Sequence, residues 1–114
     1  MEYRILGKTG VKVSSLCFGT MSFGGDADES MSESMFHLCR ENGINFFDCA
    51  NVYQQGRAEE ILGKLIKTCR QEVVITSKVY FPTGSGVNDG GSSRYHIMNA
   101  VEASLKRLDT DRID

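Results

Sequence analysis

The feature that most constrains this chain is a repeated unit, in which a short apolar run is followed by an amphipathic helical pattern. Three apolar runs, the clearest over residues 73–77, end at Gly19, Asp48 and Lys78, so the run ends fall 29 and then 30 residues apart. The runs lack apolar–polar alternation, which is typical of parallel strands buried on both faces and covered by helices. The repeat therefore predicts an α/β fold of successive βα units.

The segments between the runs predict three helices. They span residues 28–41 and about 57–68, and the third follows a serine cap at position 92 or 93. Ser30 and Glu33 have the spacing of a capping box in the first helix. The expected apolar faces are Met31, Met35, Leu38 and Cys39 in the first helix, Ala58, Ile61, Leu62, Leu65, Ile66 and Cys69 in the second, and Ile97, Ala100, Val101, Leu105 and Leu108 in the third.

A β-hairpin is predicted ahead of the first βα unit, over residues 3–14, with its turn at residues 7–10. Residues 112–114 have the pattern of an opening fourth strand. The expected cross-strand partners in the hairpin are Tyr3 and Ile5 on one strand and Val11 and Val13 on the other.

A barrel is favoured over a doubly wound dinucleotide-binding fold. The glycines nearest the end of the first strand, at Gly19, Gly24 and Gly25, do not have the spacing of a Rossmann fingerprint. A complete (β/α)₈ barrel takes ~250 residues. We therefore interpret residues 1–114 as the N-terminal part of one incomplete TIM-barrel domain, with a hairpin plug and three βα units. Its open parallel edge is a site at which the chain could self-associate.

The composition is that of an ordinary globular domain, with 25% charged residues, 40% hydrophobic residues and a formal net charge of −2. Without a basic cluster there is no electrostatic footprint for nucleic acid or an anionic membrane. No apolar run approaches the ~20 residues of a membrane-spanning helix, and the N-terminus lacks the build of a secretory signal. A cytoplasmic location is therefore expected.

The four cysteines, Cys17, Cys39, Cys49 and Cys69, include no C-x-x-C pair and no histidine at zinc-ligand spacing. We interpret them as buried, reduced thiols that pack as small hydrophobic residues. A disulfide framework or a metal site is the alternative, and no metal ligands are assigned.

Two of the predicted strands end in charged residues, Asp48 and Lys78, which are unfavourable for packing in a buried sheet. Tyr53 follows five residues after the aspartate. The C-terminal ends of parallel strands converge on the active site of such folds, so we expect these side chains to meet. An ammonium near a tyrosine favours the phenolate and improves the tyrosine as a general acid. The trio predicts protonation of a carbonyl oxygen by Tyr53, tuned by Lys78 and anchored by Asp48, with a cofactor as the hydride source.

Each member of the trio also has a purely structural interpretation. Asp48 could cap a loop, Tyr53 could cover the core, and Lys78 could be a solvated strand end. The coincidence of all three on an evenly spaced βα frame favours the catalytic interpretation.

Five stretches resemble the aldo/keto reductase superfamily in order and spacing: residues 7–14, 18–21, 48–53, 58–63 and 76–78. Within the superfamily, the chain is similar to bacterial general-stress reductases and to the potassium-channel β-subunit branch. The resemblance covers essentially the whole chain. It implies a (β/α)₈ barrel whose base is plugged by the N-terminal hairpin.

The resemblance also implies chemistry: reversible hydride transfer from NADPH to a small aldehyde or ketone. Tyr53 would be the proton donor, with Asp48 and Lys78 as members of a catalytic tetrad. The residues implied to hold the nicotinamide end of the cofactor are Gly19, Met21 and, at its ribose, Thr20 and Asp48.

Two parts of the family pattern have no counterpart in residues 1–114. The family's tetrad histidine ends strand four, and its adenosine-phosphate-binding residues lie near the C-terminus. Neither His37 nor His96 is a substitute, and both are expected on helix surfaces. We expect the 114-residue chain alone to have little or no reductase activity. The alternative to an enzyme is a catalytically incomplete fragment, or a non-catalytic relative that binds a nucleotide or a partner protein.

Overall fold

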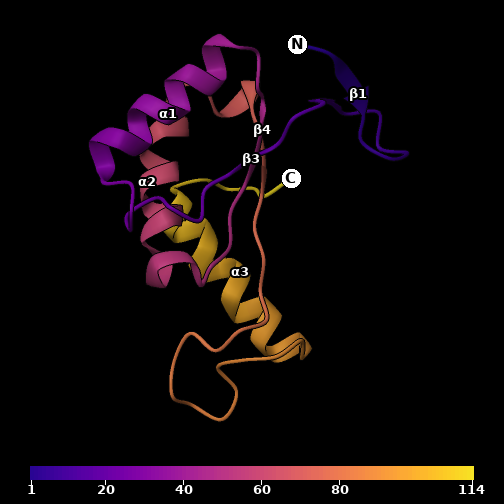
Figure 1. Ribbon diagram of the computed structural model, residues 1–114. Helices are drawn as coiled ribbons and strands as arrows, with labels where there is room; N and C mark the ends of the chain where they lie inside the picture. The colour runs from indigo at the N-terminus through magenta and orange to yellow at the C-terminus, as the bar shows by residue number, and fades with distance from the viewer.

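The computed structural model describes residues 1–114 and contains two sheets and three α-helices (Figure 1). The strands are β1 (Tyr3–Ile5), β2 (Lys12–Ser14), β3 (Phe18–Gly19), β4 (Phe46–Asp48) and β5 (Val74–Thr76). The helices are α1 (Glu29–Glu41), α2 (Arg57–Ile66) and α3 (Arg94–Leu108), with short 3₁₀ turns η1 (Tyr53–Gly56) and η2 (Arg70–Glu72). Strands β1 and β2 pair antiparallel, whereas β3, β4 and β5 form a parallel sheet in that order, as the repeat predicts. None of the helices has the length and apolar character that a membrane crossing requires.

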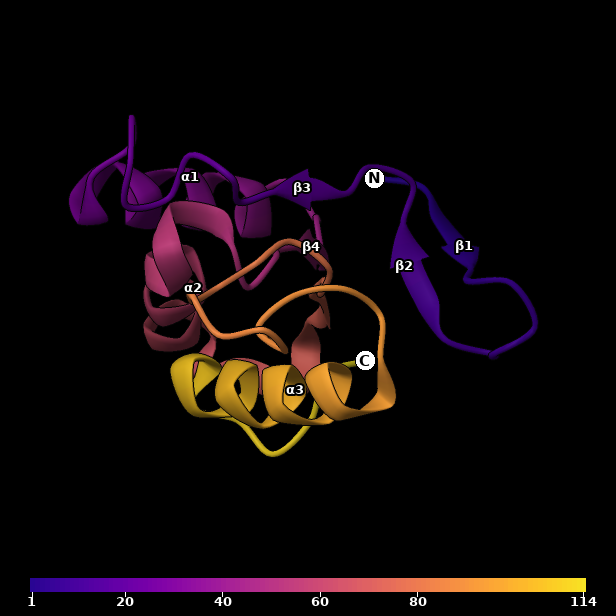
Figure 2. The ribbon, with the colours of Figure 1, turned by 90° about the horizontal axis from the view of Figure 1, so that it is seen from below.

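The three helices lie along one side of the parallel sheet (Figure 2). Phe47 and Ile75, at the centres of β4 and β5, are completely buried. Their neighbours Phe46 and Val74 are half-buried, so the expectation of burial on both faces is confirmed only in part. In a closed barrel the inner face is filled by side chains from the other strands.

The N-cap of α1 is Asp28, whose carboxylate accepts a hydrogen bond from the backbone N–H of Met31, so the capping box predicted at Ser30 is wrong. Aspartate is as good an N-cap as serine, and it starts the helix two residues earlier. In α3, the serine cap predicted at position 92 or 93 lies at Ser93, whose hydroxyl accepts from the N–H of His96.

The apolar face predicted for α1 is half right: Met35 packs against the core and Cys39 is buried, but Met31 and Leu38 are wrong and the prediction omits Phe36. Phe36 is fully buried and its ring centroid lies 4.8 Å from that of Phe47. Met31 and Leu38 are exposed, because at 3.6 residues per turn they fall on the side of the helix away from Phe36. Cys39, three residues beyond Phe36, is buried as predicted.

Helices α2 and α3 pack directly against each other. The stripe predicted for α2 is confirmed at Ala58, Ile61, Leu62 and Ile66. The buried residues of α3 follow a spacing of four: His96, Ala100, Ser104 and Leu108. The surface position expected for His96 is therefore wrong, because it lies one turn before Ala100 on the face that α3 turns inward. His37 lies on the surface of α1 as expected, beside Glu33.

The register of the hairpin differs by one residue from the prediction. Tyr3 pairs with Ser14, and Val13 pairs with Arg4. The cause is the turn, which closes with a 2.9 Å hydrogen bond from the N–H of Leu6 to the carbonyl of Val11. A shift of one residue moves each side chain to the opposite face of the ribbon.

The hairpin is joined to the parallel sheet by Asn45. The Asn45 Oδ1 accepts from the N–H of Ser14 at 2.7 Å, and its Nδ2 donates to the carbonyl of Lys12 at 3.1 Å. Asn45 immediately precedes β4, so the hairpin lies at the amino end of the parallel strands, away from their carboxyl ends (Figure 1). This is the place expected for a plug at the base of a barrel.

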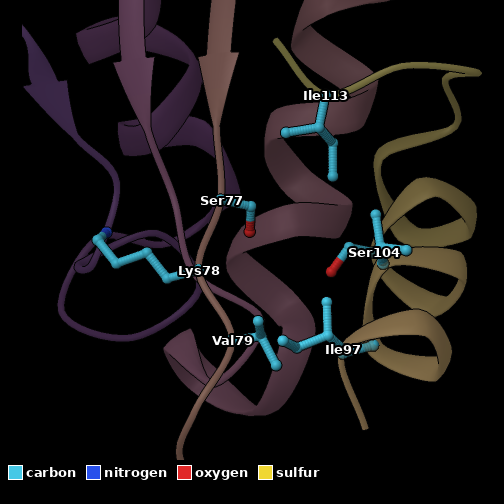
Figure 3. Close-up of a pocket in the computed structure, with 8 residues that line it drawn as sticks. Ser77, Lys78, Val79, Ile97, Ser104 and Ile113 are labelled. Atoms are coloured by element: carbon cyan, nitrogen blue, oxygen red, sulfur yellow. The ribbon is translucent and has the colours of Figure 1, made fainter. Parts of the chain in front are cut away.

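The outer edge of β5 is partly covered by the last residues of the chain. The N–H of Asp114 donates to the carbonyl of Ile75 at 2.9 Å, and the N–H of Ile75 donates to Asp114 Oδ2 at the same distance. Residues 112–114 thus begin to run beside β5 without forming a regular strand. Between this edge and α3 lies a hollow of about 160 Å³, lined by apolar side chains that include Val79 and Ile97 (Figure 3). Self-association through this edge stays a prediction.

The cysteines are all free thiols, and no cluster of histidine, cysteine and acidic side chains is arranged to hold a metal. Cys39 and Cys49 are buried and Cys69 is half-buried. Cys17 is exposed, contrary to expectation. It directly precedes β3, and because its neighbour Phe18 packs against the core, the alternation of side chains turns Cys17 to the face that the helices do not cover.

The contact between α2 and α3 predicts a clash at Gly63. A Cβ atom there would lie 2.7 Å from the backbone carbonyl oxygen of Leu108. Overpacking of this kind costs about 1–3 kcal/mol, more than the ~1 kcal/mol that alanine gains over glycine in a helix. We expect Gly63→Ala to lower the free energy of unfolding in urea by about 1–2 kcal/mol. Gly19→Ala is the control, because its Cβ would meet no atom within 4 Å. An equal or larger loss in the control would contradict this account.

The cysteines predict an order of alkylation. Burial raises the pKa of the Cys49 thiol to about 11, whereas Cys17 is exposed. Alkylation requires both thiolate and access, so iodoacetamide at pH 8 should modify Cys17 first and Cys49 last. Peptide mass spectrometry at timed intervals measures the order, and labelling in urea confirms that all four thiols can react. Labelling of Cys49 ahead of Cys17 in the folded protein would show that the burial is wrong.

Candidate active site

The parallel register brings the carboxyl ends of three strands together. Gly19 of β3 pairs with Asp48 of β4, and Asp48 pairs with Thr76 of β5. Lys78 therefore lies two residues beyond the partner of Asp48, although the apolar runs of the sequence end at these two residues. Its long side chain spans the difference and reaches back to the aspartate.

The Lys78 ammonium is the centre of the site. Its Nζ lies 2.5 Å from Asp48 Oδ2, 2.8 Å from the carbonyl oxygen of Cys49 and 3.2 Å from Tyr53 Oη. It also stands 4.9 Å from the centroid of the Tyr53 ring, within the range of a cation–π contact. The structure thus brings together the three residues that the sequence singles out, Asp48, Tyr53 and Lys78.

Asp48 is held on both its side chain and its backbone. While Oδ2 accepts from Lys78, Oδ1 accepts from Thr76 Oγ1 at 2.8 Å. The Asp48 carbonyl accepts from the N–H of Thr20 at 2.9 Å and from its hydroxyl at 3.0 Å. The carboxylate therefore has one fixed orientation, with each oxygen assigned to a different donor.

Tyr53 reaches the lysine because the chain turns sharply after β4. Tyr53 opens η1, and its N–H donates to the carbonyl of Ala50 at 3.2 Å. The next residues, Gln54 and Gln55, have φ values of 49° and 56°, in the left-handed region that side chains other than those of glycine and asparagine rarely adopt. Such backbone strain is concentrated at functional sites. Neither of these two positions is a glycine or an asparagine, and Gly56, which follows them with a φ of 92°, is the one local sequence signal of the turn.

The electrostatics of the site keep Lys78 charged. Burial opposes the ammonium form, but hydrogen bonds to Asp48 and Tyr53, together with their charges, raise the pKa of Lys78 above its ordinary value. A permanent cation next to a phenol is the arrangement that stabilises a phenolate.

The residues at the end of β3 are placed differently from one another. Gly19 and Met21 are exposed at the rim, whereas Thr20 is completely buried. The Thr20 hydroxyl faces the β4 backbone, not the open side of the sheet. A pocket of about 230 Å³ lies beside Tyr53 and Lys78 and is lined by Tyr80, Phe81 and other mainly apolar residues.

Sequence reasoning missed two groups of residues behind the site. Thr76, which holds Asp48, lies two residues before Lys78 on the same face of the strand, so strand periodicity carries the signal for it. Glu59 is completely buried and accepts hydrogen bonds from two side chains. Ser77 lies directly after β5, and Arg107 lies in α3. A charged residue beside the apolar stripe of α2 is the only sequence signal for that group.

Comparisons with known proteins agree with this geometry. The sequence profile of the aldo/keto reductase family matches residues 15–114. A protein of Arabidopsis thaliana named "Probable voltage-gated potassium channel subunit beta" is 48% identical over all of this chain and 36% of its own length. The "Uncharacterized oxidoreductase YrpG" of Bacillus subtilis is 45% identical over all of this chain and 38% of its own length.

A solved structure shows the same fold. The aldo-keto reductase AKR11C1 of Bacillus halodurans, in its holo form, superposes with a TM-score of 0.86 and 38% identity over all of this chain and 38% of its own. The chain thus spans a little over a third of the length of these relatives. The predicted partial barrel is confirmed. The chain belongs to the aldo/keto reductase family and forms the hairpin and the first three βα units of its (β/α)₈ barrel.

Proposed function

We propose that this chain carries the acid–base centre of an NADP(H)-dependent oxidoreductase that reduces aldehydes and ketones to alcohols, with Tyr53 as the proton donor. The observation that carries the proposal is the position of Lys78 Nζ, 2.5 Å from Asp48 Oδ2 and 3.2 Å from Tyr53 Oη. Membership of the aldo/keto reductase family and the similarity to a Bacillus oxidoreductase support it. Because the chain spans a little over a third of its relatives' length, the proposal concerns the protein at its natural length.

The reduction of a carbonyl adds a hydride to carbon and a proton to oxygen. A bound NADPH supplies the hydride. Tyr53 Oη gives its proton to the carbonyl oxygen, and the Lys78 ammonium stabilises the phenolate that remains. Asp48 holds the ammonium in place and balances its charge. The pocket beside Tyr53, with Tyr80 and Phe81 in its wall, gives the rest of the substrate an apolar surface.

The strand ends fit a nicotinamide cofactor. At Gly19 the position of a Cβ has no atom within 4 Å, so the end of β3 is open to close approach by a flat ring. Met21 is exposed beside it, and Asp48 is partly accessible. Thr20 has no accessible surface, and its hydroxyl is engaged by the Asp48 carbonyl. We therefore propose that Gly19, Met21 and Asp48 contact the cofactor and that Thr20 positions Asp48.

A second candidate function is non-catalytic binding of a nucleotide or a partner protein. It is favoured by the 48% identity to a plant protein whose name is that of a potassium channel subunit. The two functions differ in turnover, because a binding protein would retain NADPH without oxidising it when a carbonyl compound is added.

Removal of the Tyr53 hydroxyl separates these possibilities. Loss of a general acid typically costs 10²–10⁴-fold in rate, so Tyr53→Phe should lower kcat for NADPH-dependent reduction of an aldehyde such as 4-nitrobenzaldehyde by about that factor. The Kd for NADPH, measured by fluorescence, should stay unchanged. Tyr95→Phe is the matched control, since Tyr95 is exposed on α3. Full activity in Tyr53→Phe would show that Tyr53 is not the proton donor. NADPH binding without turnover in the unmodified protein would favour the binding function.

A further inference from the structure

A buried carboxylate lies directly behind the site, on the side of the sheet that the helices cover. Glu59, in the first turn of α2, has no exposed surface. Its Oε1 accepts from Ser77 Oγ at 2.6 Å, and its Oε2 accepts from Arg107 Nε at 2.6 Å. A buried charge is tolerated only when it is paired and hydrogen-bonded, and both conditions hold here.

Ser77 and Lys78 leave the strand end on opposite sides (Figure 3). Ladder pairing stops at Thr76, so both residues lie beyond the regular part of β5. The Lys78 backbone is held through its carbonyl, which accepts from the N–H of Asn51 at 3.1 Å. The hydrogen bond from Ser77 to Glu59 is a second anchor of this segment, beyond the last residue pair of the ladder. Because neighbouring side chains alternate, fixing Ser77 on the helix side fixes Lys78 on the other.

Glu59 is also tied to the segment that carries Tyr53. Helix α2 begins directly after η1, whose first residue is Tyr53. Glu59 therefore bridges the two segments that supply the phenol and the ammonium. Arg107 of α3 pairs with the Glu59 carboxylate and donates a further hydrogen bond to Ser104 Oγ at 3.3 Å.

We propose that Glu59, acting through Ser77, is a positioning residue that sets the distance between the Lys78 ammonium and the Tyr53 hydroxyl. This inference rests on the proposed reductase function of the same site. Glu59 touches neither Tyr53 nor Lys78, so its effect passes through the backbone at residues 77 and 78.

Ser77 is the residue to vary, because removal of Glu59 would leave the Arg107 charge unpaired and could prevent folding. Ser77→Ala deletes one hydrogen bond and keeps the Glu59–Arg107 pair. Ser77→Thr restores a hydroxyl, and the hollow of about 160 Å³ beside Ser77 has room for its methyl group. Glu60→Gln is the matched control, because Glu60 is exposed and pairs with Arg57 on the surface of α2.

The test measures kcat and KM on the protein at its natural length. A displacement of a catalytic group by about 1 Å can cost 10²-fold, so we expect Ser77→Ala to lower kcat about tenfold to a hundredfold with little change in the KM for NADPH. Ser77→Thr should recover most of the loss, and Glu60→Gln should behave as the unmodified protein. A Ser77→Ala variant with unchanged kcat would overturn the proposal, whether or not its stability had fallen.

A second readout does not depend on turnover. The Lys78 ε-carbon can be titrated by NMR in protein labelled with ¹³C-lysine. If Ser77 positions the ammonium against its partners, the pKa of Lys78 falls back toward its ordinary value in Ser77→Ala and recovers in Ser77→Thr. An identical titration in all variants would overturn the positioning role. Absence of turnover in the unmodified protein, with the titration shift present, would instead overturn the proposed reduction and leave the positioning intact.

Discussion

The site depends on the burial of Phe47 and Ile75 against the helices. Both side chains are fully buried at the centres of their strands, and this fixes which face every neighbouring residue takes. Successive side chains of a strand alternate, so Asp48 and Thr76 must project from the opposite face. The hydrophobic packing on one side of the sheet thereby places the polar groups on the other. A change of one residue in the register would send the aspartate into the core.

The contact between helices α2 and α3 is a second constraint on the structure behind the site. At Gly63 the backbone of the chain near Leu108 approaches so closely that only a hydrogen atom fits. The same contact carries the ion pair between Glu59 and Arg107, which is closed to solvent on the glutamate side. Apolar packing and a charge pair with a buried carboxylate thus meet in one interface, directly behind the strand end that bears Lys78.

Elements with a strong periodic signal could be predicted from the sequence, and those decided by tertiary contact could not. The stripe of α2 follows from local pattern alone, and the same kind of pattern limits the cap of α3 to Ser92 or Ser93. The inward face of α1 depends on where Phe36 meets Phe47, and the pattern of α1 alone does not contain that contact. The burial of His96 likewise follows from how α3 packs, since a histidine gives no apolar signal.

The residues of the candidate site likewise differ in whether the sequence alone could identify them. Asp48 and Lys78 stand out by residue type, because charged side chains are unusual at the ends of buried strands, and Tyr53 stands out as a phenol five residues after the aspartate. Glu59 does not stand out, because it adjoins Glu60 and the two residues are chemically identical in the sequence. Only the packing of α3 makes one of them buried and leaves the other exposed.

One contact at the turn after β4 has a mechanical consequence. The Gln54 side chain donates from Nε2 to the carbonyl of Met21 at 3.2 Å, although the two residues belong to different βα loops. A hydrogen bond therefore joins the loop that follows β3 to the loop that carries Tyr53. A hydrogen bond of this kind contributes about 0.5–1.5 kcal/mol, so joint movement of the two loops is favoured over independent movement by about that amount.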